Sequence, residues 1–155
     1  MNGIALSAFA EFFVTVGAPL RLGAHGFGEG RIIPISGGRA EGAITGEILA
    51  GGADGQAIRE DGLTRIHARY VIRTEDGALV RVDSRGMRSG PPEVMARLLK
   101  GEPVDPSKVY FMTAISFDTA AAEHDGLNHS LFLARGIREP DCVRLSVFRA
   151  DMGIA

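Results

Sequence analysis

The feature that most constrains this chain is a β-hairpin predicted for residues 64–86, which read TRIHARYVIRTEDGALVRVDSRG. We take residues 75–77 as its loop, because Gly77 suits the left-handed position that a three-residue hairpin loop requires. This register sets Tyr70 opposite Ser84 and Ile72 opposite Val82. A two-residue Asp-Gly loop would shift the pairing by one residue and mix apolar with charged side chains on both faces. The longer loop is therefore favoured.

The predicted hairpin has one apolar and one charged face, because side chains alternate between the two sides of a strand. The apolar face carries Ile66, Ala68, Tyr70, Ile72, Val80, Val82 and Ser84, and the charged face carries His67, Arg69, Val71, Arg73, Leu79, Arg81, Asp83 and Arg85. Tyr70 is thus expected in the core.

Further period-2 or apolar segments predict strands on both sides of this hairpin. They are residues 8–16, 31–35, 39–49, 109–118, 130–136 and 143–149. Residues 22–30 and 51–62 are rich in glycine and are expected to be loops, and the Ser36-Gly37-Gly38 segment is expected to be a turn. Residues 119–128 are expected to form a helical turn or a loop.

One helix is predicted, from Pro91 to Lys100, with Ser89 able to cap it, an apolar stripe on one side and Gly101 at its end. Seven or eight strands with no βαβ alternation indicate an antiparallel barrel or a sandwich. Closure removes exposed strand edges, so we expect an all-β chain of one domain over residues 1–155: a small closed antiparallel β-barrel with one short α-helix outside it or across one end.

Composition excludes several classes of function. The formal net charge of -2 gives no electrostatic basis for a nucleic-acid or membrane partner. The single cysteine, Cys142, cannot form an internal disulfide and has no metal-ligand partners nearby. The apolar start lacks basic residues and is interrupted by Glu11, so we expect no secretory signal and a cytoplasmic location.

The charged face of the hairpin is the first candidate for a functional site. Arg69 lies within cross-strand reach of Asp83, and His67 within reach of Arg85. Taken alone, this pattern favours the solvated outside of a sheet over a barrel with a polar lumen. Asp54 and Gln56, which follow Gly51-Gly52, are ordinary turn residues unless the backbone directs them inward. His124 and His129 suggest a metal, but no second cluster has ligand spacing, so we expect no metal and no cofactor.

The ordered motifs RIIPISGG, GGADGQ, EDG, ARYVIRTEDGALV and the segment from Phe117 to Asn128 resemble the domain-of-unknown-function 3237 family, also called uncharacterised protein family 0311. The resemblance covers residues 12–148 and implies a small β-barrel without a generally established activity. It maps the family's polar positions onto Arg31, Asp54, Gln56, Asp61, Arg69, Tyr70, Arg85 and Asn128. The resemblance also favours a barrel with a functional polar lumen over the interpretation of the charged face as a solvated surface.

Two functions are then open. The first is a cofactor-free acid–base enzyme of the isomerase, cyclase or lyase type, acting on a small oxygenated or anionic molecule in the lumen. Asp54 or Asp83 would be its base, Arg69 and Arg85 would hold the anion, and Gln56 or Asn128 would orient it. The second is a small-molecule binding protein without turnover. We expect the charged residues to converge at one mouth of the barrel under Asn128.

A homo-oligomer is also expected. Phe9, Phe12 and Phe13 cannot all point to one side of a strand, so at least one of them requires an external partner.

Overall fold

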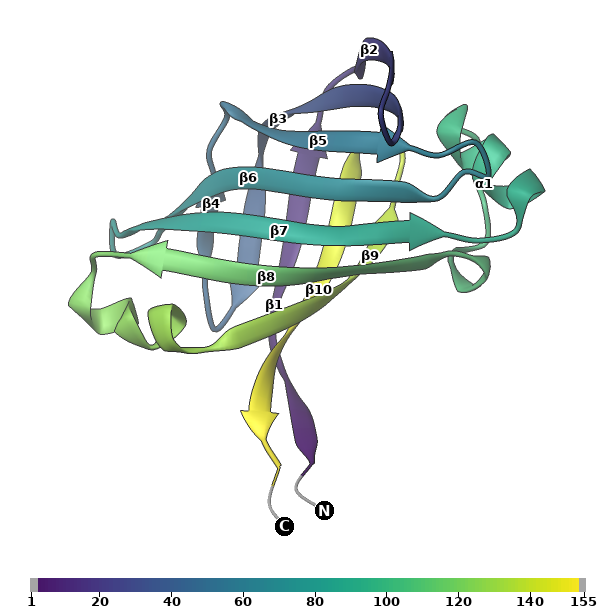
Figure 1. The fold of residues 1–155 in the computed structure, drawn as a ribbon. Helices are drawn as coiled ribbons and strands as arrows, with labels where there is room; N and C mark the ends of the chain where they lie inside the picture. The colour runs from purple at the N-terminus through teal and green to yellow at the C-terminus, as the bar shows by residue number, and fades with distance from the viewer. Residues whose placement is uncertain (1–2, 154–155) are drawn as a thin grey trace.

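The computed structural model describes residues 3–153, and these form ten strands, one α-helix and two 3-10 helices (Figure 1). The strands are β1 (Ile4–Val16), β2 (Leu20–His25), β3 (Gly28–Gly42), β4 (Gly46–Ile48), β5 (Gly52–Ile58), β6 (Thr64–Thr74), β7 (Leu79–Ser89), β8 (Tyr110–Thr119), β9 (Leu131–Arg138) and β10 (Cys142–Met152). The helices are α1 (Pro92–Leu99), η1 (Pro106–Lys108) and η2 (Ala122–His129).

The sheet closes on itself as an antiparallel barrel. Its strands follow the order β1, β10, β9, β8, β7 and β6, and the circuit returns through β3 to β1. The short strands β4 and β5 share the position between β6 and β3, since each pairs with both neighbours. Strand β2 folds back on β3 outside this circuit. The predicted closed antiparallel β-barrel is thus confirmed.

The central hairpin forms as β6 and β7, with Gly77 at a φ of 86°. The apolar and charged faces are those predicted, but the register is not: Tyr70 pairs with Val82 and Ile72 with Val80. The expected pairing was offset by two residues, because the loop of residues 75–77 places Thr74 against Ala78, whose carbonyl accepts from the Thr74 amide at 2.9 Å. An offset of two leaves every side chain on its expected face.

Glycine-rich segments account for the other differences from the expected elements. Residues 22–30 form the β2–β3 hairpin rather than a loop, and residues 52–58 form β5. Gly37 and Gly38 bend β3 without ending it, whereas the expected strand over residues 39–49 is broken after Gly42. In β2, β3 and β5 hydrogen bonding to neighbouring strands outweighs the weak strand preference of glycine.

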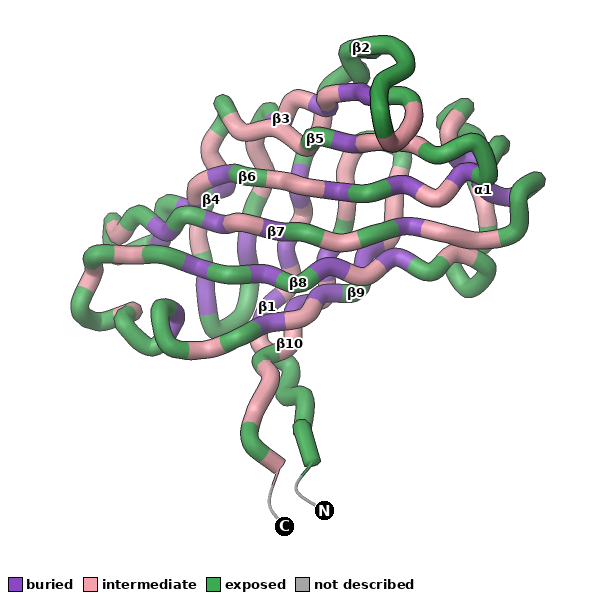
Figure 2. The backbone as a smooth tube through the Cα atoms, viewed as in Figure 1, coloured by how far each residue is buried: buried purple, intermediate pink, exposed green. Residues whose placement is uncertain are grey.

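The barrel has two different ends. Near η2 it is filled by a core of tightly packed aromatic side chains, in which the Phe117 and Phe132 rings lie 4.8 Å apart. At the other end lies α1, which buries Val94, Met95 and Leu98 (Figure 1). Its N-cap is Pro91 without a side-chain hydrogen bond, so the predicted cap by Ser89 is wrong because Ser89 is the last residue of β7. Buried positions alternate along the strands between these two ends (Figure 2).

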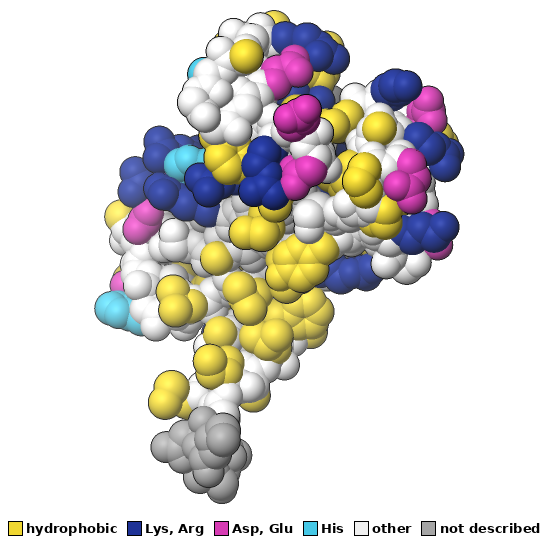
Figure 3. Space-filling model, turned by 45° about the vertical axis from the view of Figure 1, so that its right-hand side comes forward, with side chains coloured by type: hydrophobic (Ala, Val, Ile, Leu, Met, Phe, Trp, Pro, Cys, Tyr) yellow, Lys and Arg dark blue, Asp and Glu magenta, His cyan; other side chains and the backbone are white. Residues whose placement is uncertain are grey.

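The start of β1 and the end of β10 leave the barrel as a two-stranded stalk, residues 4–8 paired with residues 148–152 (Figure 1). Hydrophobic side chains continue from the barrel surface onto this stalk (Figure 3). Of the three phenylalanines of β1, Phe12 is fully buried and Phe9 packs on Phe132 at 4.8 Å. Phe13 faces outward, where the guanidinium of Arg39 lies 3.8 Å above its ring. Phe13 therefore has a partner within its own chain.

Candidate functional site

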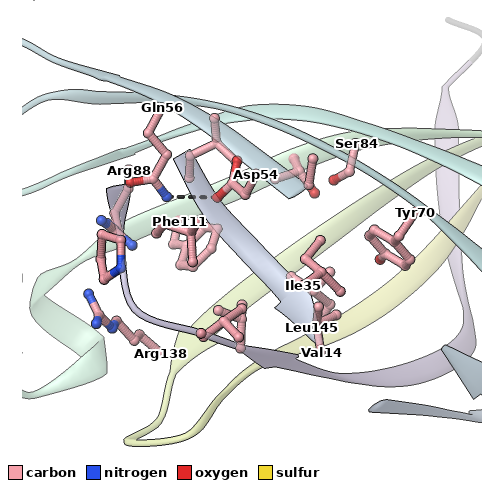
Figure 4. Close-up of a pocket in the computed structure, with 18 residues that line it drawn as sticks. Val14, Ile35, Asp54, Gln56, Tyr70, Ser84, Arg88, Phe111, Arg138 and Leu145 are labelled. Atoms are coloured by element: carbon pink, nitrogen blue, oxygen red, sulfur yellow. Dashed lines mark hydrogen bonds between the residues drawn. The ribbon is translucent and has the colours of Figure 1, made fainter. Parts of the chain in front are cut away.

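The candidate site is a cavity of about 60 Å³ inside the barrel, at the end nearer α1 (Figure 4). Its wall is mainly apolar and includes Val14, Ile33, Ile35, Ile66, Phe111 and Leu145. Polar side chains enter it from four strands: Asp54 and Gln56 from β5, Ser84 and Arg88 from β7, Thr113 from β8 and Arg138 from β9. The exposed residues Gly17 and Pro19 also line it, which places its mouth beside the β1–β2 connection.

A chain of hydrogen bonds orients the acidic group of this site. Arg31 on β3 donates from Nε to Oε1 of Gln56 at 2.7 Å, and Gln56 donates from Nε2 to Oδ2 of Asp54 at 2.7 Å. Strand pairing fixes these partners, because Arg31 lies opposite Gln56 in the β3–β5 ladder. The second carboxylate oxygen of Asp54, Oδ1, is hidden from solvent and accepts no hydrogen bond of ordinary geometry from the protein, although the backbone amide of His67 also acts on this carboxylate.

Several other buried polar atoms at this end also lack a protein partner. They are Nε and Nη2 of Arg88, Nη2 of Arg31, Oγ1 of Thr113 and the hydroxyl of Tyr70. Arg88 is only 2% exposed, and its guanidinium lies 5.6 Å from the centre of the Phe111 ring. Leaving a buried donor unsatisfied costs roughly 1–3 kcal/mol, more for a charged group. Such a concentration of unpaired donors indicates a place for a ligand or ordered water.

The same environment shifts the acidity of these groups. Burial raises the pKa of Asp54, and the hydrogen bond from Gln56 and the charge of Arg88 only partly oppose it. Burial, together with the charges of Arg31 and Arg138, lowers the pKa of Arg88 to about 10. The Tyr70 hydroxyl has its pKa raised by burial and by the nearby Asp54. The cavity therefore combines a carboxyl group of raised pKa with buried arginines.

The predicted convergence of Asp54, Arg69, Asp83 and Arg85 at one mouth of the barrel is wrong. Asp54 faces the lumen, but the other three lie on the outer surface, where the side chains of Arg69 and Arg85 are 65% and 67% exposed. The reason is the apolar face of the hairpin, which occupies the interior and directs the charged face to solvent. The solvated-surface interpretation, which the resemblance had displaced, describes these three residues.

On the outer surface Asp83 joins its neighbours into one cluster. Its Oδ2 accepts from Nε of Arg69 at 3.2 Å and its Oδ1 from Nε of Arg85 at 3.1 Å, while His67 Nε2 lies 3.2 Å from Oδ2. Partial burial acts to raise the pKa of Asp83, but the hydrogen bonds from His67 and Arg85 lower it below its ordinary value. The predicted reach between Arg69 and Asp83 is correct, and the cluster faces solvent.

Asn128 also lies away from the cavity. It accepts from the backbone amide of Thr119 at 2.9 Å and donates to the Thr119 carbonyl at 2.9 Å, so it fastens η2 to the end of β8. This is the end of the barrel opposite α1 (Figure 1). Asn128 therefore does not close over the charged residues as expected.

The remaining polar positions have local partners. Asp61 pairs with Arg59 on the surface. His124 Nε2 lies 2.9 Å from Oδ2 of Asp76, and His129 Nε2 lies 3.2 Å from Oδ2 of Asp125, so the two histidines do not meet in one site.

Sequence reasoning missed Arg88, Thr113 and Arg138, although a signal for the first two was present. Arg88 continues the inward series Val80, Val82, Ser84 and Gly86, and Thr113 lies between Phe111 and Ile115 on the inward face of β8. An arginine at the inward position of an otherwise apolar strand could have been found by extending the alternation past Gly86.

The fold and this lumen define a small closed β-barrel protein whose interior combines an apolar wall with a buried carboxylate and arginines. Residues 4–150 match the model of a family described as protein of unknown function (DUF3237), and the chain belongs to this family. It is 42% identical to a UPF0311 protein of Bradyrhizobium diazoefficiens over 132 residues, 85% of this chain and 87% of that protein. It is 33% identical to a UPF0311 protein of Clostridium acetobutylicum over 138 residues, 88% of this chain and 87% of that protein.

Solved structures show the same fold. A conserved protein of unknown function from Rhodopseudomonas palustris superimposes with a TM-score of 0.91 at 35% identity, over 96% of this chain and 98% of that one. A β-barrel-like protein from Acinetobacter baumannii gives a TM-score of 0.84 at 34% identity, over 96% and 97% of the two chains. An enzyme from Penicillium herquei shares the fold with a TM-score of 0.70 at 18% identity, over 97% and 95%. Within residues 3–153, no helix has the length and apolar character needed to cross a bilayer.

Proposed function

We propose that this protein is a cofactor-free acid–base enzyme that acts on a small oxygenated or anionic molecule inside the barrel, with Asp54 as its base. The observation that carries the proposal is the free Oδ1 of Asp54, which is buried at a cavity that Arg88 also lines. A carboxylate alone would be a poor base in water, but burial raises its pKa towards the working range of a catalyst.

The arrangement supports proton removal from a carbon next to a carbonyl group. Oδ1 of Asp54 takes the proton, the electron pair of the carbon–hydrogen bond moves into the new carbon–carbon double bond, and the carbonyl electrons move onto oxygen. The resulting enolate oxygen is negative, and the unpaired donors of Arg88 and Arg31 are the groups that would stabilise it. Return of the proton to another atom completes an isomerisation.

Gln56 supports the base by holding Oδ2, which leaves Oδ1 directed to the cavity. The roles first given to Asp83, Arg69, Arg85 and Asn128 do not transfer, because these side chains do not reach the lumen. Asp61 likewise stays outside, paired with Arg59.

The test is exchange of carbon-bound protons for deuterium. Acetone, hydroxyacetone and pyruvate are incubated in D₂O with the protein, and their proton NMR signals are followed. The expected result is enzyme-dependent exchange in at least one of them, reduced roughly 10²–10⁴-fold by Asp54→Asn, which removes the base. Asp83→Asn on the outer surface is the matched control and should exchange at the wild-type rate.

A non-catalytic binding protein is the second candidate function. The unpaired arginine donors favour it as strongly as they favour the enzyme, whereas the free carboxylate oxygen of Asp54 favours the enzyme alone. Binding of a panel member without any exchange would select the binding protein.

A further inference from the structure

We infer that the ligand of the lumen is a short-chain oxo or hydroxy monocarboxylate whose carboxylate is held by the side edge of Arg88. This inference deepens the proposed function and rests on its assignment of the lumen as the ligand site. It starts from which nitrogen atoms of the buried arginines lack partners.

Nε and Nη2 of Arg88 are both unpaired and buried. These two nitrogens form one edge of the guanidinium, and their parallel N–H bonds match the two oxygens of a carboxylate in a bidentate pair. A single oxygen can accept from both nitrogens, as Oδ2 of Asp118 does from Arg81 on the surface, but a carboxylate supplies one oxygen for each N–H bond together with a compensating negative charge. The pattern of unpaired atoms therefore favours a carboxylate at Arg88.

Arg31 offers less. Its Nε already donates to Gln56, so Nη2 is its unpaired atom, and Oγ1 of Thr113 is a second isolated polar atom. Single donors suit one further oxygen, such as an oxo or hydroxyl group next to the carboxylate. Neither Arg31 nor Thr113 repeats the buried two-nitrogen edge of Arg88.

The charge balance agrees with an anionic ligand. Arg88 and Arg138 line the cavity and Arg31 lies beside it, against the single carboxylate of Asp54. Net positive charge in a buried site is costly, and a bound carboxylate offsets part of it.

The size of the cavity limits the rest of the ligand. About 60 Å³ is well under half of the roughly 150 Å³ of an apolar protein cavity known to hold benzene. The apolar wall beyond the polar end, which includes Val14, Ile35 and Leu145, suits a methyl or ethyl group (Figure 4). Acids of the size of pyruvate or lactate are therefore favoured over larger aromatic acids.

The first experiment uses the unmodified protein and compares acids with their uncharged amides. Isothermal titration is performed with pyruvate, lactate, propionate and benzoate, and with pyruvamide and lactamide. Pyruvate and lactate should bind at least tenfold more tightly than their amides and more tightly than propionate or benzoate. Equal binding of pyruvate and pyruvamide, or tightest binding of benzoate, overturns the inference.

Variants then assign the contact to Arg88. Arg88→Lys keeps the charge but loses the bidentate edge, and it should weaken pyruvate binding at least tenfold. Arg69→Lys, on the outer surface, should leave it unchanged. Wild-type affinity in a folded Arg88→Lys protein overturns the inference, and the acid–amide comparison still decides the matter if that variant does not fold.

Asp54→Asn separates this inference from the proposed function. The variant should bind pyruvate at least as tightly as the wild type, since a negative charge is removed, while losing proton exchange. Arg88-dependent binding of pyruvate without exchange in the wild type overturns the proposed function alone. Exchange of acetone by a protein that does not bind pyruvate overturns this inference alone.

Discussion

Gln56 donates a hydrogen bond from Nε2 to Oδ2 of Asp54 over 2.7 Å, and both residues project from β5 into the barrel. They are two positions apart on one strand, so they share its inward face. The bond occupies one oxygen of the carboxylate and leaves the other at the cavity. Gln56 is not expected to touch a reacting atom. It nevertheless sets the orientation of the Asp54 carboxylate and lowers its pKa.

Replacing Gln56 with Leu should raise the pKa of Asp54 above its wild-type value, because the hydrogen bond from Gln56 favours the charged carboxylate. The measurement is a carbon-13 NMR titration of the Asp54 carboxyl group, with Asp54→Asn identifying the signal. An unchanged or lowered pKa would show that the hydrogen bond does not tune the carboxylate.

The stability difference between wild type and Asp54→Asn should depend on pH. Because burial raises the pKa of Asp54, the folded protein holds this proton more tightly than the unfolded chain does. Protonated Asp54 therefore contributes its full stability to the wild type below the ordinary aspartate pKa. This contribution is lost as the pH rises through the raised pKa of Asp54 in the folded protein. The measurement is urea unfolding at a series of pH values, starting at about 3.5, close to the ordinary aspartate pKa. As the pH rises, the free energy of unfolding of the wild type should fall relative to that of Asp54→Asn. A pH-independent difference would contradict this prediction.

Replacing Arg88 with Met should leave the protein as stable as the wild type or stabilise it, by up to about 4 kcal/mol. Arg88 is buried with two unpaired nitrogens, so the folded protein carries a desolvation cost that methionine does not. Thermal unfolding without ligand is the measurement, and Arg69→Met on the surface serves as control. A large loss of stability specific to Arg88→Met would show that the guanidinium is held by structural contacts instead.

Two glycines with almost the same backbone conformation should respond differently to alanine. Gly62 and Gly77 have φ of 88° and 86°, so alanine is strained at both, by roughly 1–2 kcal/mol. A Cβ atom at Gly62 would lie 2.7 Å from Cβ of Met95, whereas one at Gly77 meets nothing within 4 Å. Denaturant unfolding should therefore show a larger loss for Gly62→Ala. Equal losses would mean that α1 moves freely away from the β5–β6 connection.

A homo-oligomer remains a prediction, and the stalk now gives it a better basis than the phenylalanines. Ile4, Leu6 and Met152 are 80%, 51% and 88% exposed, and residues 4–8 of β1 pair with β10 on one side only. A lone two-stranded ribbon is marginally stable in water, so a second copy would cover it. Light scattering at micromolar concentration should give a mass above 16.4 kDa, reduced to that of one chain by Leu6→Lys. A wild-type monomer would contradict the prediction.

The barrel could be predicted because its strongest signal is local. The alternation in residues 64–86 fixes which side of each strand is apolar, and a barrel wall repeats that choice on every strand. The elements that were missed lie in residues 22–30 and 51–62, where glycine weakens local preference and pairing with distant strands decides. Such pairing has no short-range signature.

The site could be predicted only in part. Asp54 and Gln56 entered the predicted site through the family resemblance, since their glycine-rich segment alone indicates ordinary turn residues. The charged face of the hairpin drew Arg69, Asp83 and Arg85 into the prediction. The arginine that does enter the lumen, Arg88, was overlooked because the alternation was followed only to Arg85. Which strands bring their polar residues to one height in a barrel depends on register between distant segments, and Arg31, Arg88 and Asp54 meet for that reason.

The stalk brings the two ends of the described chain together, since the amide of Gly153 donates to the carbonyl of Gly3 at 2.8 Å. A short peptide bridge would therefore make the backbone a continuous loop without disturbing any strand. Such a circular backbone can be opened at another exposed turn, for example beside Gly77, to give a circular permutant with the same barrel strands. New termini there would lie in the β6–β7 turn, far from the cavity mouth beside Gly17 and Pro19, so a tag could be attached without obstructing the lumen.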